Sequence, residues 1–343
     1  MAQAHTAGRR PKVVLGLSGG VDSAVAARLL MERWEVYCLY LDAGLGEAGR
    51  ADAAAVAERL GLPFEAADIR AALEEHVCAP FAADYLAGRT PLPCARCNRL
   101  VKFPALLALA ERIGAQWVAT GHYARAENGA LLRGMPANDQ SYMLSRLTKE
   151  QLRKVIFPLG NYEKAGVRAL AQAFDLPVAE KPDSMEICFI PEGDYAAWLD
   201  QRGGTPPPGD FVDPQGNLLG RHKGIHHYTL GQRRGLGVSG PHRYFVCAIQ
   251  PEENRVVLSG GTGPFSAAIR CIQPNWIAID ALGGPMEVTV RLRHSKTELP
   301  AVISPSGADV LVHTAVPARA PTPGQLAVFY RGQAVLGSAW ITA

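Results

Sequence analysis

Apolar and polar positions follow one pattern in the first half of the chain and a different pattern in the second half. In the first half, apolar runs at residues 13–15, 36–41 and 117–120 alternate with stretches of good helix formers, such as residues 24–31 and 100–113. Buried strands that alternate with helices are typical of a parallel sheet covered on both faces. This part of the chain is therefore predicted to be an α/β domain that binds its ligands at the carboxyl ends of the strands.

The composition changes after Gln201. Residues 203–209, Gly-Gly-Thr-Pro-Pro-Pro-Gly, indicate a linker stiffened by prolines, and helical patterns are scarce beyond it. Alternating apolar positions at residues 287–293, 309–313, 325–330 and 334–341 predict the strands of a small closed β-barrel. We predict a catalytic α/β domain over residues 10–203, a small and mostly β domain over 204–263, and a C-terminal β-barrel over 264–343.

A glycine-rich stretch, Gly-Leu-Ser-Gly-Gly-Val-Asp-Ser at residues 16–23, lies between the first predicted strand and the first predicted helix. Glycines let the backbone approach an anion closely, and the free N–H groups of a first helical turn point toward that anion. The stretch therefore predicts a phosphate site, although it contains no Walker A sequence. An ordinary glycine turn between strand and helix is the alternative interpretation.

The two serines and the aspartate make this stretch similar to the pyrophosphate loop of the ATP pyrophosphatase (PP-loop) family. Members of that family split ATP between the α and β phosphates and adenylate an acceptor oxygen. The resemblance implies that the hydroxyls of Ser18 and Ser23 hold phosphate oxygens and that Asp22 helps to place a magnesium ion.

Two of the seven cysteines are distinguished by their neighbours. Cys97 precedes the predicted helix and follows Arg96, and both a helix start and a neighbouring cation favour the thiolate. Cys188 lies in an apolar run, which from the residues alone indicates a buried and inert thiol. The odd number of cysteines favours the cytoplasm, and neither a signal peptide nor an apolar run of about 18 residues is evident.

A segment without carboxylates, residues 221–243, concentrates positive charge in a chain whose net charge is only +3. Such a patch fits contact with a phosphate backbone, and a solvated, glycine-rich β-meander is an equally good alternative. Its basic residues are Arg221, His222, Lys223, His226, His227, Arg233, Arg234, His242 and Arg243.

Several stretches, in this order, make the chain similar to the bacterial tRNA-specific 2-thiouridylase family, and the likeness covers residues 13–340. The resemblance implies ATP-dependent thiolation of the wobble uridine in tRNAs for Lys, Glu and Gln. ATP adenylates the uridine C2 oxygen, AMP leaves, and sulfur arrives as a persulfide from a cysteine desulfurase or a sulfur-relay protein. The stretches are the glycine-rich turn, Cys94-Ala-Arg-Cys97-Asn98, Gly121-His122-Tyr123, Asp139-Gln140-Ser141-Tyr142, Ile187-Cys188-Phe189-Ile190 and residues 224–237.

The resemblance also implies roles for individual residues. Cys188 receives the persulfide, and Cys97 is the nucleophile that helps to release or deliver the sulfur. The residues matched to ATP binding are Gly16, Leu17, Ser18, Gly19, Gly20, Val21, Asp22, Ser23, Leu41 and Gly121. The residues matched to tRNA binding are His122, Asn138, Asp139, Gln140, Arg293, His294 and Gln325, with Leu92, Pro93 and Cys94 in the loop that meets the target base.

The chain departs from the best-known members of this family at two places. They carry Asn-Pro-Asp where this chain has Leu-Pro-Cys at residues 92–94, and Thr-Gly where it has Met-Glu at 185–186. With Cys94 present, the thiolates of Cys94, Cys97 and Cys188 suit a [4Fe-4S] cluster whose fourth iron holds a hydrosulfide. A redox disulfide between Cys97 and Cys188 is the competing account, and zinc lacks a fourth ligand.

Three other functions are weighed against this one. An amide-forming PP-loop ligase needs neither the cysteines nor the basic β-rich half. A non-enzymatic RNA-binding module leaves the phosphate turn unexplained. A related enzyme that thiolates a tRNA cytidine usually lacks the C-terminal barrel.

Overall fold

The computed structural model describes residues 10–183, 187–190, 193–240, 242–261, 263–295 and 297–342. Within them the chain forms two compact units. The first consists of the described residues up to Leu73 and those from Asn98 to Asp183, and the second of Glu74–Cys97 and the described residues from Ile187 onward. Met185 and Glu186, which precede Ile187 and Cys188, lie outside the described residues.

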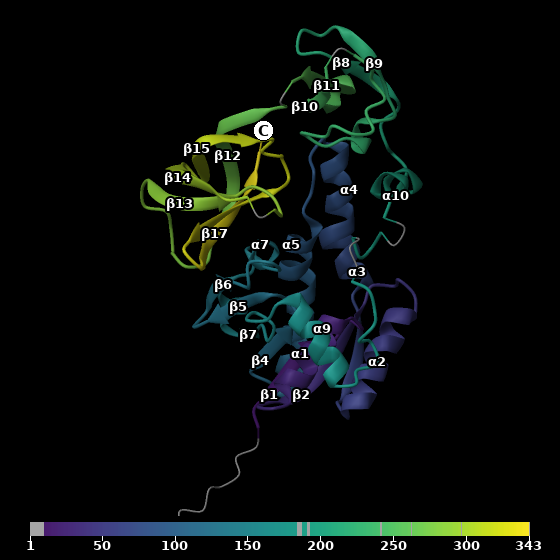
Figure 1. Cartoon of the computed structure of the whole chain (residues 1–343), viewed down its shortest axis with the longest axis vertical. Helices are drawn as coiled ribbons and strands as arrows, with labels where there is room; N and C mark the ends of the chain where they lie inside the picture. Colours follow the sequence, from purple (N-terminus) through teal and green to yellow (C-terminus); the bar gives the residue numbers. More distant parts are fainter. Residues whose placement is uncertain are drawn as a thin grey trace, which may run out of the picture. The chain divides into compact units, whose positions relative to one another are not determined.

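The first unit contains a parallel sheet in the order β3-β2-β1-β4-β7 (Figure 1). All its pairings are parallel, and the central strand β1 is flanked by β2 and β4. This arrangement confirms the predicted α/β domain. The strands are β1 (Lys12–Gly16), β2 (Glu35–Asp42), β3 (Phe64–Asp68), β4 (Trp117–Thr120) and β7 (Val155–Ile156).

Helices cover both faces of this sheet, because right-handed crossovers place the helix before β4 opposite the helix after β1. The helix α1 packs against β2, α2 and α9, whereas α6 packs against β1 and β4. The helices of this unit are α1 (Val21–Leu30), α2 (Ala48–Leu60), α3 (Arg70–Leu73), a π-helix η2 (Asn98–Lys102), α6 (Phe103–Ile113), α7 (Ser141–Leu144), α8 (Lys149–Arg153) and α9 (Lys164–Ala173).

A hairpin of β5 (Ala124–Glu127) and β6 (Ala130–Arg133) follows β4 in the sequence. Its two turn residues, Asn128 and Gly129, have φ angles of +52° and +81°. Positive φ at both positions is the geometry for which an Asn-Gly pair is selected.

The second unit begins with a π-helix η1 (Glu74–Cys78), α4 (Ala79–Leu86) and α5 (Pro93–Cys97), to which α10 (Tyr195–Arg202) is added. The sequence predicts a loop through Arg96 and a helix start at Cys97, and this is wrong. The helix starts at Pro93, because proline fits the first helical position, where its missing N–H is not needed.

Two β-structures complete the second unit. A four-stranded sheet in the order β10-β11-β8-β9 is built from β8 (Gly209–Val212), β9 (Leu218–His222), β10 (Tyr244–Gln250) and β11 (Arg255–Gly260). Short 3-10 helices lie at Ile225–His227 (η3) and Pro251–Glu253 (η4).

The last six strands form an antiparallel barrel in the order β12-β15-β14-β13-β16-β17, closed by pairing of β12 with β17. Its core is filled by fully buried side chains such as Val290, Ile303 and Phe329. The barrel confirms the prediction from alternating apolar positions. Its strands are β12 (Phe265–Trp276), β13 (Met286–Arg291), β14 (Leu299–Ser306), β15 (Asp309–Arg319), β16 (Leu326–Arg331) and β17 (Ala334–Ile341).

Across the described residues, none of the helices combines the length and the apolar character that a membrane crossing requires.

Candidate active site

The glycine-rich turn joins β1 to α1 at the carboxyl edge of the parallel sheet. Gly19 has a φ of +74°, and a Cβ there would lie 2.4 Å from the carbonyl oxygen of Gly49, so only glycine fits. The Oγ of Ser23 accepts from the backbone N–H of Ser18 at 3.1 Å and donates to the carbonyl oxygen of Gly20 at 3.0 Å. Gly20 offers no side-chain cap, so the first N–H groups of α1 can bind an anion.

Neighbouring strands bring two further residues to this edge. Leu41 lies at the end of β2, and Gly121 directly follows β4. A Cβ on Gly121 would lie 2.9 Å from backbone atoms of Asp22 and Ser23, so glycine lets the end of β4 touch the first turn of α1. The structure therefore gathers the matched nucleotide residues of three strands at one edge, and their binding of ATP stays a prediction.

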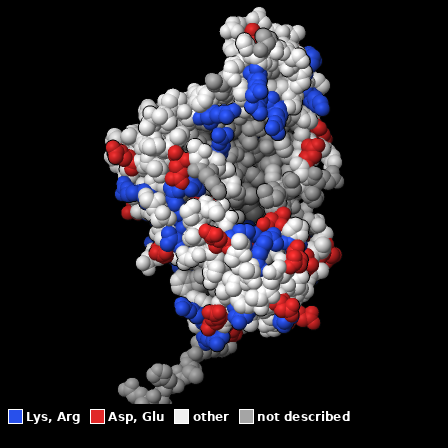
Figure 2. Space-filling view, in the orientation of Figure 1, with Lys and Arg blue, Asp and Glu red and all other residues white. Residues whose placement is uncertain are grey.

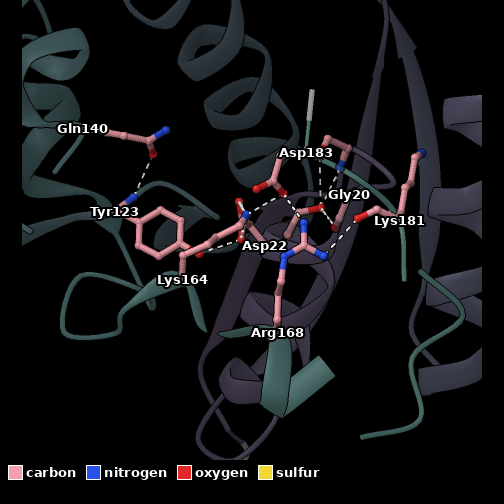
Figure 3. A network of polar contacts seen from close by, with 10 residues as sticks. Gly20, Asp22, Tyr123, Gln140, Lys164, Arg168, Lys181 and Asp183 are labelled. Carbon is pink, nitrogen blue, oxygen red and sulfur yellow. Dashed lines mark hydrogen bonds and ion pairs between the residues drawn. The ribbon is translucent and has the colours of Figure 1, made fainter. Parts of the chain in front are cut away.

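Asp22 lies in the first turn of α1 beside a cation and a phenol (Figure 3). Its two carboxylate oxygens are each 2.7 Å from Nζ of Lys164, and the Tyr123 hydroxyl donates to its Oδ1 at 2.6 Å. Burial and then the hydrogen bond to Asp22 raise the pKa of Tyr123, so this hydroxyl stays protonated as a donor. The carboxylate is thus fixed beside the glycine-rich turn, and its role as a ligand for Mg²⁺ stays a prediction.

The sequence pattern does not single out three cations beside this turn (Figure 3). Lys164 and Arg168 each pair with Asp183 at 2.8 Å, and Nζ of Lys181 donates to the carbonyl oxygen of Gly19 at 2.9 Å. Lys181 and Gly19 are 162 positions apart in the chain, and α9 carries the other two cations against α1. The carboxylates of Asp22, Asp52 and Asp183 pair with these cations, so the fold places a network of paired charges beside the turn.

His122 follows β4 and is a predicted tRNA contact. Its Nδ1 hydrogen-bonds with Oγ1 of Thr120 at 2.7 Å, and its ring lies 6.5 Å and 6.2 Å from the rings of Phe103 and Phe157. Burial, with a smaller effect of Lys102, lowers the pKa of His122 well below its ordinary value. The ring is therefore neutral near pH 7, and it could meet RNA by hydrogen bonding or stacking but not as a cation.

The turn before α7 carries the other matched tRNA residues of this unit. The Asp139 side chain is buried, and its carboxylate accepts from two backbone N–H groups and from the Ser141 hydroxyl, each at 3.0 Å. The Oε1 of Gln140 accepts from the backbone N–H of Tyr123 at 2.9 Å. Asp139 and Gln140 thus shape this turn, next to half-buried Asn138, and their contact with tRNA stays a prediction.

The second unit holds the matched catalytic thiols. The helix α5 places exposed Cys94 in its first turn and half-buried Cys97 at its last residue, so Cys94, and not Cys97, lies at the helix start. Cys188 is exposed, which corrects its residue-based interpretation as a buried thiol. Cys188 is also a free thiol, so no disulfide joins it to Cys97 in the structure.

Cys78 lies close to both catalytic candidates. Burial raises its pKa to about 12, with smaller contributions from neighbouring charges that include Cys188 and Cys97. The helix α5, which ends at Cys97, packs against η1, which ends at Cys78. Phe189, next to Cys188, contacts Phe81, three positions after Cys78. Cys97 and Cys188, which are distant in sequence, therefore converge on one part of the second unit.

Phe189 anchors the segment that carries Cys188. Its ring lies 5.3 Å from that of Phe81 on α4 and 5.4 Å from that of Trp198 on α10. Phe81 and Trp198 also meet edge to face at 5.7 Å. This aromatic trio, in which Phe81 and Phe189 are buried, positions the exposed Cys188 beside it.

The loop before α5 is held by Pro323 and Gln325, which lie just before strand β16 of the barrel. The backbone N–H of Thr90 donates to the carbonyl oxygen of Pro323 at 2.8 Å, and Nε2 of Gln325 donates to the carbonyl oxygens of Thr90 and Pro91 at 2.9 Å and 3.2 Å. Gly324 has a φ of +90°, and a Cβ there would lie 2.8 Å from the Thr90 oxygen. Gln325, matched to tRNA binding, thus also holds the loop that leads to buried Leu92 and Pro93.

Exposed positive side chains mark the remaining candidates for RNA contact. Arg293 and His294 are exposed after β13. In the basic segment, Lys223, Arg233 and Arg234 are exposed, and Figure 2 shows Lys and Arg side chains gathered over the part that carries β8–β11.

Cys94, Cys97 and Cys188 offer the thiolate donors by which iron–sulfur clusters are held. Among the cysteines that the structure describes, no three sulfur atoms lie within 4.8 Å of one another, so these thiols do not form a single-ion site. Whether they hold a cluster stays a prediction.

The chain matches known families along nearly its whole length. Residues 11–192 match the family model described as a tRNA methyl transferase HUP domain. Residues 197–260 match a tRNA methyl transferase PRC-barrel domain, and residues 266–341 match an aminomethyltransferase beta-barrel domain.

Three of its curated relatives are tRNA-specific 2-thiouridylases. The chain is 44% identical to the tRNA-specific 2-thiouridylase MnmA of Heliobacterium modesticaldum, over 96% of this chain and 92% of the relative. It is 43% identical to MnmA 1 of Caldanaerobacter subterraneus subsp. tengcongensis, over 95% of this chain and 96% of the relative. It is 42% identical to MnmA of Acidithiobacillus ferrooxidans, over 96% of this chain and 98% of the relative.

Proposed function

Since this chain belongs to the tRNA-specific 2-thiouridylase family, we propose that it uses ATP to replace the C2 oxygen of the wobble uridine in tRNA with sulfur. The substrates are the tRNAs for Lys, Glu and Gln, and the enzyme is a tRNA-uridine 2-sulfurtransferase. The observation that supports the proposal is a glycine-rich turn at a helix start in one unit and converging thiols in the other, within a chain that matches a family member over 96% of its length.

The first step activates the uridine. The C2 oxygen attacks the α phosphorus of ATP as N3 loses its proton, the bond from the α phosphorus to the oxygen that bridges to the β phosphate breaks, and pyrophosphate leaves. In this proposal the turn of Ser18 to Ser23 holds the departing phosphates through N–H and hydroxyl groups. Asp22 would hold Mg²⁺, which would supply positive charge to the phosphates, and Lys164 and Lys181 offset the charge that develops on pyrophosphate.

The second step exchanges AMP for sulfur. The terminal sulfur of a persulfide on Cys188 attacks the activated C2 carbon, and AMP leaves with the former uridine oxygen. Cys97 then attacks the Cys188 sulfur, which breaks the S–S bond, frees the C2 thione and leaves a Cys97–Cys188 disulfide for a thiol reductant to open. The exposure of Cys188 supports this role, because the persulfide must be loaded from another protein.

The alternative sulfur source uses a [4Fe-4S] cluster held by Cys94, Cys97 and Cys188. Bound there, the cluster would supply an open iron site for sulfide. If the cluster is the sulfur source, iron and inorganic sulfide co-purify with the chain under exclusion of oxygen, at about four iron atoms per chain. Loss of the iron in Cys94→Ala would agree, and iron-free enzyme with full activity excludes the cluster.

Three further points belong to the proposal. The tRNA contacts His122, residues 138–140, the loop at 92–94, Arg293, His294 and Gln325, and the basic segment at 221–243 contacts its phosphates.

The sulfur donor is a cysteine desulfurase or a relay protein, and the enzyme works in the cytoplasm. The domains divide at residues 203–204 and 263–264.

The function is tested by mass spectrometry of digested tRNA from a deletion strain complemented with variants. Cys97→Ala and Cys188→Ala are each expected to abolish wobble 2-thiouridine while ATP binding to the purified protein persists. Cys247→Ala, in β10, is the matched control and is expected to thiolate normally. Normal 2-thiouridine with either catalytic variant would overturn the assignment.

A further inference from the structure

One hydroxyl group in the second unit contacts two elements that belong to the proposed sulfur chemistry. Oγ1 of Thr90, in the loop that leads to α5, donates to Oγ1 of Thr229 at 3.3 Å. The hydroxyl of Tyr195, the first residue of α10, also hydrogen-bonds with the Thr229 side chain. Thr90 and Thr229 are 139 positions apart in the chain, so the fold and not the local sequence brings this group to both elements.

The turn that carries Thr229 is held in place by its own hydrogen bonds. The backbone N–H of Thr229 donates to Oε1 of Gln232 at 3.0 Å, and the backbone N–H of Gln232 donates to the carbonyl oxygen of Thr229 at 3.0 Å. Two further bonds attach the turn to β10, from the N–H of Gly231 to the carbonyl oxygen of Val246 at 2.8 Å, and from the N–H of Val246 to that of Gln232 at 3.0 Å. The Thr229 hydroxyl therefore has a well-defined position.

The first element that it contacts leads to Cys97. Thr90 lies three positions before Pro93, where α5 begins, and Cys97 is the last residue of that helix. The backbone of this loop also contacts β10, since a Cβ on Gly88 would lie 2.9 Å from the Ile249 side chain. The bond between the two threonines thus adds a side-chain contact to a loop whose backbone is already held.

The second element leads to Cys188. The ring of Tyr195 stacks on that of Tyr85 in α4, with centroids 4.4 Å apart and planes 20° from parallel. The next turn of α10 carries Trp198, whose ring contacts that of Phe189 beside Cys188. A shift of the start of α10 would therefore also move the aromatic contact that anchors the Cys188 segment.

Both contacts depend on the hydroxyl of Thr229. A hydroxyl has one proton and two lone pairs, so it can accept from Thr90 and donate to Tyr195 at the same time. Serine has the same capacity, whereas valine has nearly the same shape and can make neither bond. Hydroxyls linked in a chain of this kind also strengthen one another.

We propose that Thr229 is a positioning residue for the sulfur step. Its hydroxyl holds the loop before α5 and the start of α10 in a fixed relation, and this keeps Cys97 and Cys188 within reach of each other. The inference rests on the proposed function for the roles of the two thiols.

The test measures how fast a disulfide forms between Cys97 and Cys188 in the full-length, reduced protein. Diamide takes up the two electrons and two protons that the thiols lose, and mass spectrometry of unreduced peptides follows the bond. Cys94→Ala is the parent protein, because Cys94 would compete for Cys97. Thr229→Val is expected to slow this disulfide about threefold to tenfold, the factor that one lost hydrogen bond corresponds to.

Thr229→Ser keeps the hydroxyl and is expected to form the disulfide at the parent rate. Tyr195→Phe keeps the stacked ring, removes only the second contact, and should slow the reaction as well, which tests the inference independently of how Thr229→Val folds. Thr342→Val is the matched control. It removes a hydroxyl that donates to the carbonyl oxygen of Arg270 at 3.0 Å, and it should react at the parent rate.

Equal rates in Thr229→Val and the parent, slowing by Thr229→Ser as large as by Thr229→Val, or no disulfide between Cys97 and Cys188 in the parent would each overturn the inference. Thiolation assays with Cys94 restored separate it from the proposed function, and Thr229→Val should lower kcat with little change in KM for tRNA. Normal thiolation by the wild type with a disulfide rate that ignores Thr229 refutes only the positioning role. A rate that depends on Thr229 in a chain that makes no 2-thiouridine refutes only the proposed function.

Discussion

Burial divides the thiols near the proposed sulfur chemistry into reactive and inert groups. Cys78 has a pKa raised to about 12, so at pH 8 only about one molecule in ten thousand carries its thiolate. Cys188 is exposed on the same part of the unit. We therefore predict that iodoacetamide at about pH 8 alkylates Cys188 within minutes and leaves Cys78 unmodified until the protein is denatured.

Peptide mass spectrometry before and after denaturation checks this prediction. Buried Cys271, whose pKa is also raised to about 12, serves as the internal standard for an unreactive thiol. If Cys78 were alkylated in the native protein as fast as Cys188, the packing of η1 against α5 would not protect it.

Individual residues also show where sequence reasoning succeeds. The turn at residues 16–23 could be predicted, because strand, glycines and helix are contiguous and their geometry is local. The sequence could not predict that Lys164, Arg168 and Lys181 lie beside this turn. A lysine or arginine on a helix surface has the same sequence pattern whether it faces solvent or the glycine-rich turn. The exposure of Cys188 was missed for a related reason: its apolar neighbour Phe189 is buried while the thiol beside it is not.

Among the elements, the loop from Gly88 to Leu92 depends most on contacts that are distant in sequence. Gln325 holds it by donating to two backbone carbonyls. Gln325→Glu keeps the shape but replaces the donor by a carboxylate that repels those oxygens. We predict faster amide hydrogen exchange in residues 88–93 and a local destabilisation of about 1–3 kcal/mol, the cost of an unsatisfied buried polar group.

Hydrogen exchange with peptide resolution measures this effect, and exposed Gln215→Glu is the control. A positioning role requires that thiolation by Gln325→Glu fall mainly in kcat, with its KM for tRNA little changed. A change in KM alone would instead agree with the role implied by the family, direct contact with tRNA.

The same region shows why one boundary was misplaced. Pro91 and Pro93 both indicate a break in regular structure, yet Pro93 is the first residue of α5. A proline that ends a loop and a proline that starts a helix cannot be told apart without knowing where the following N–H groups find partners. The barrel strands could be predicted, because alternating apolar and polar positions identify a strand without knowledge of its hydrogen-bond partners.

The molecule as a whole separates the two half-reactions that we propose. The phosphate turn belongs to one compact unit, and Cys94, Cys97 and Cys188 belong to the other. No described thiol takes part in the hydrogen bonds around Asp22 and Ser23, so removal of a thiol leaves that turn unchanged. Adenylation should therefore survive the loss of sulfur transfer, whereas sulfur transfer should not survive the loss of adenylation.

We predict that Cys188→Ala releases about one pyrophosphate per bound tRNA in a single turnover and forms no 2-thiouridine. Asp22→Asn is expected to slow pyrophosphate release by about a hundredfold or more, since it removes charge where the metal and the leaving group are held. Asp175→Asn, at an exposed ion pair with Arg59, is the control for both. Rapid-quench measurement of pyrophosphate decides the matter: if Cys188→Ala releases none, adenylation requires the thiol, and the two units act in one concerted step rather than in sequence.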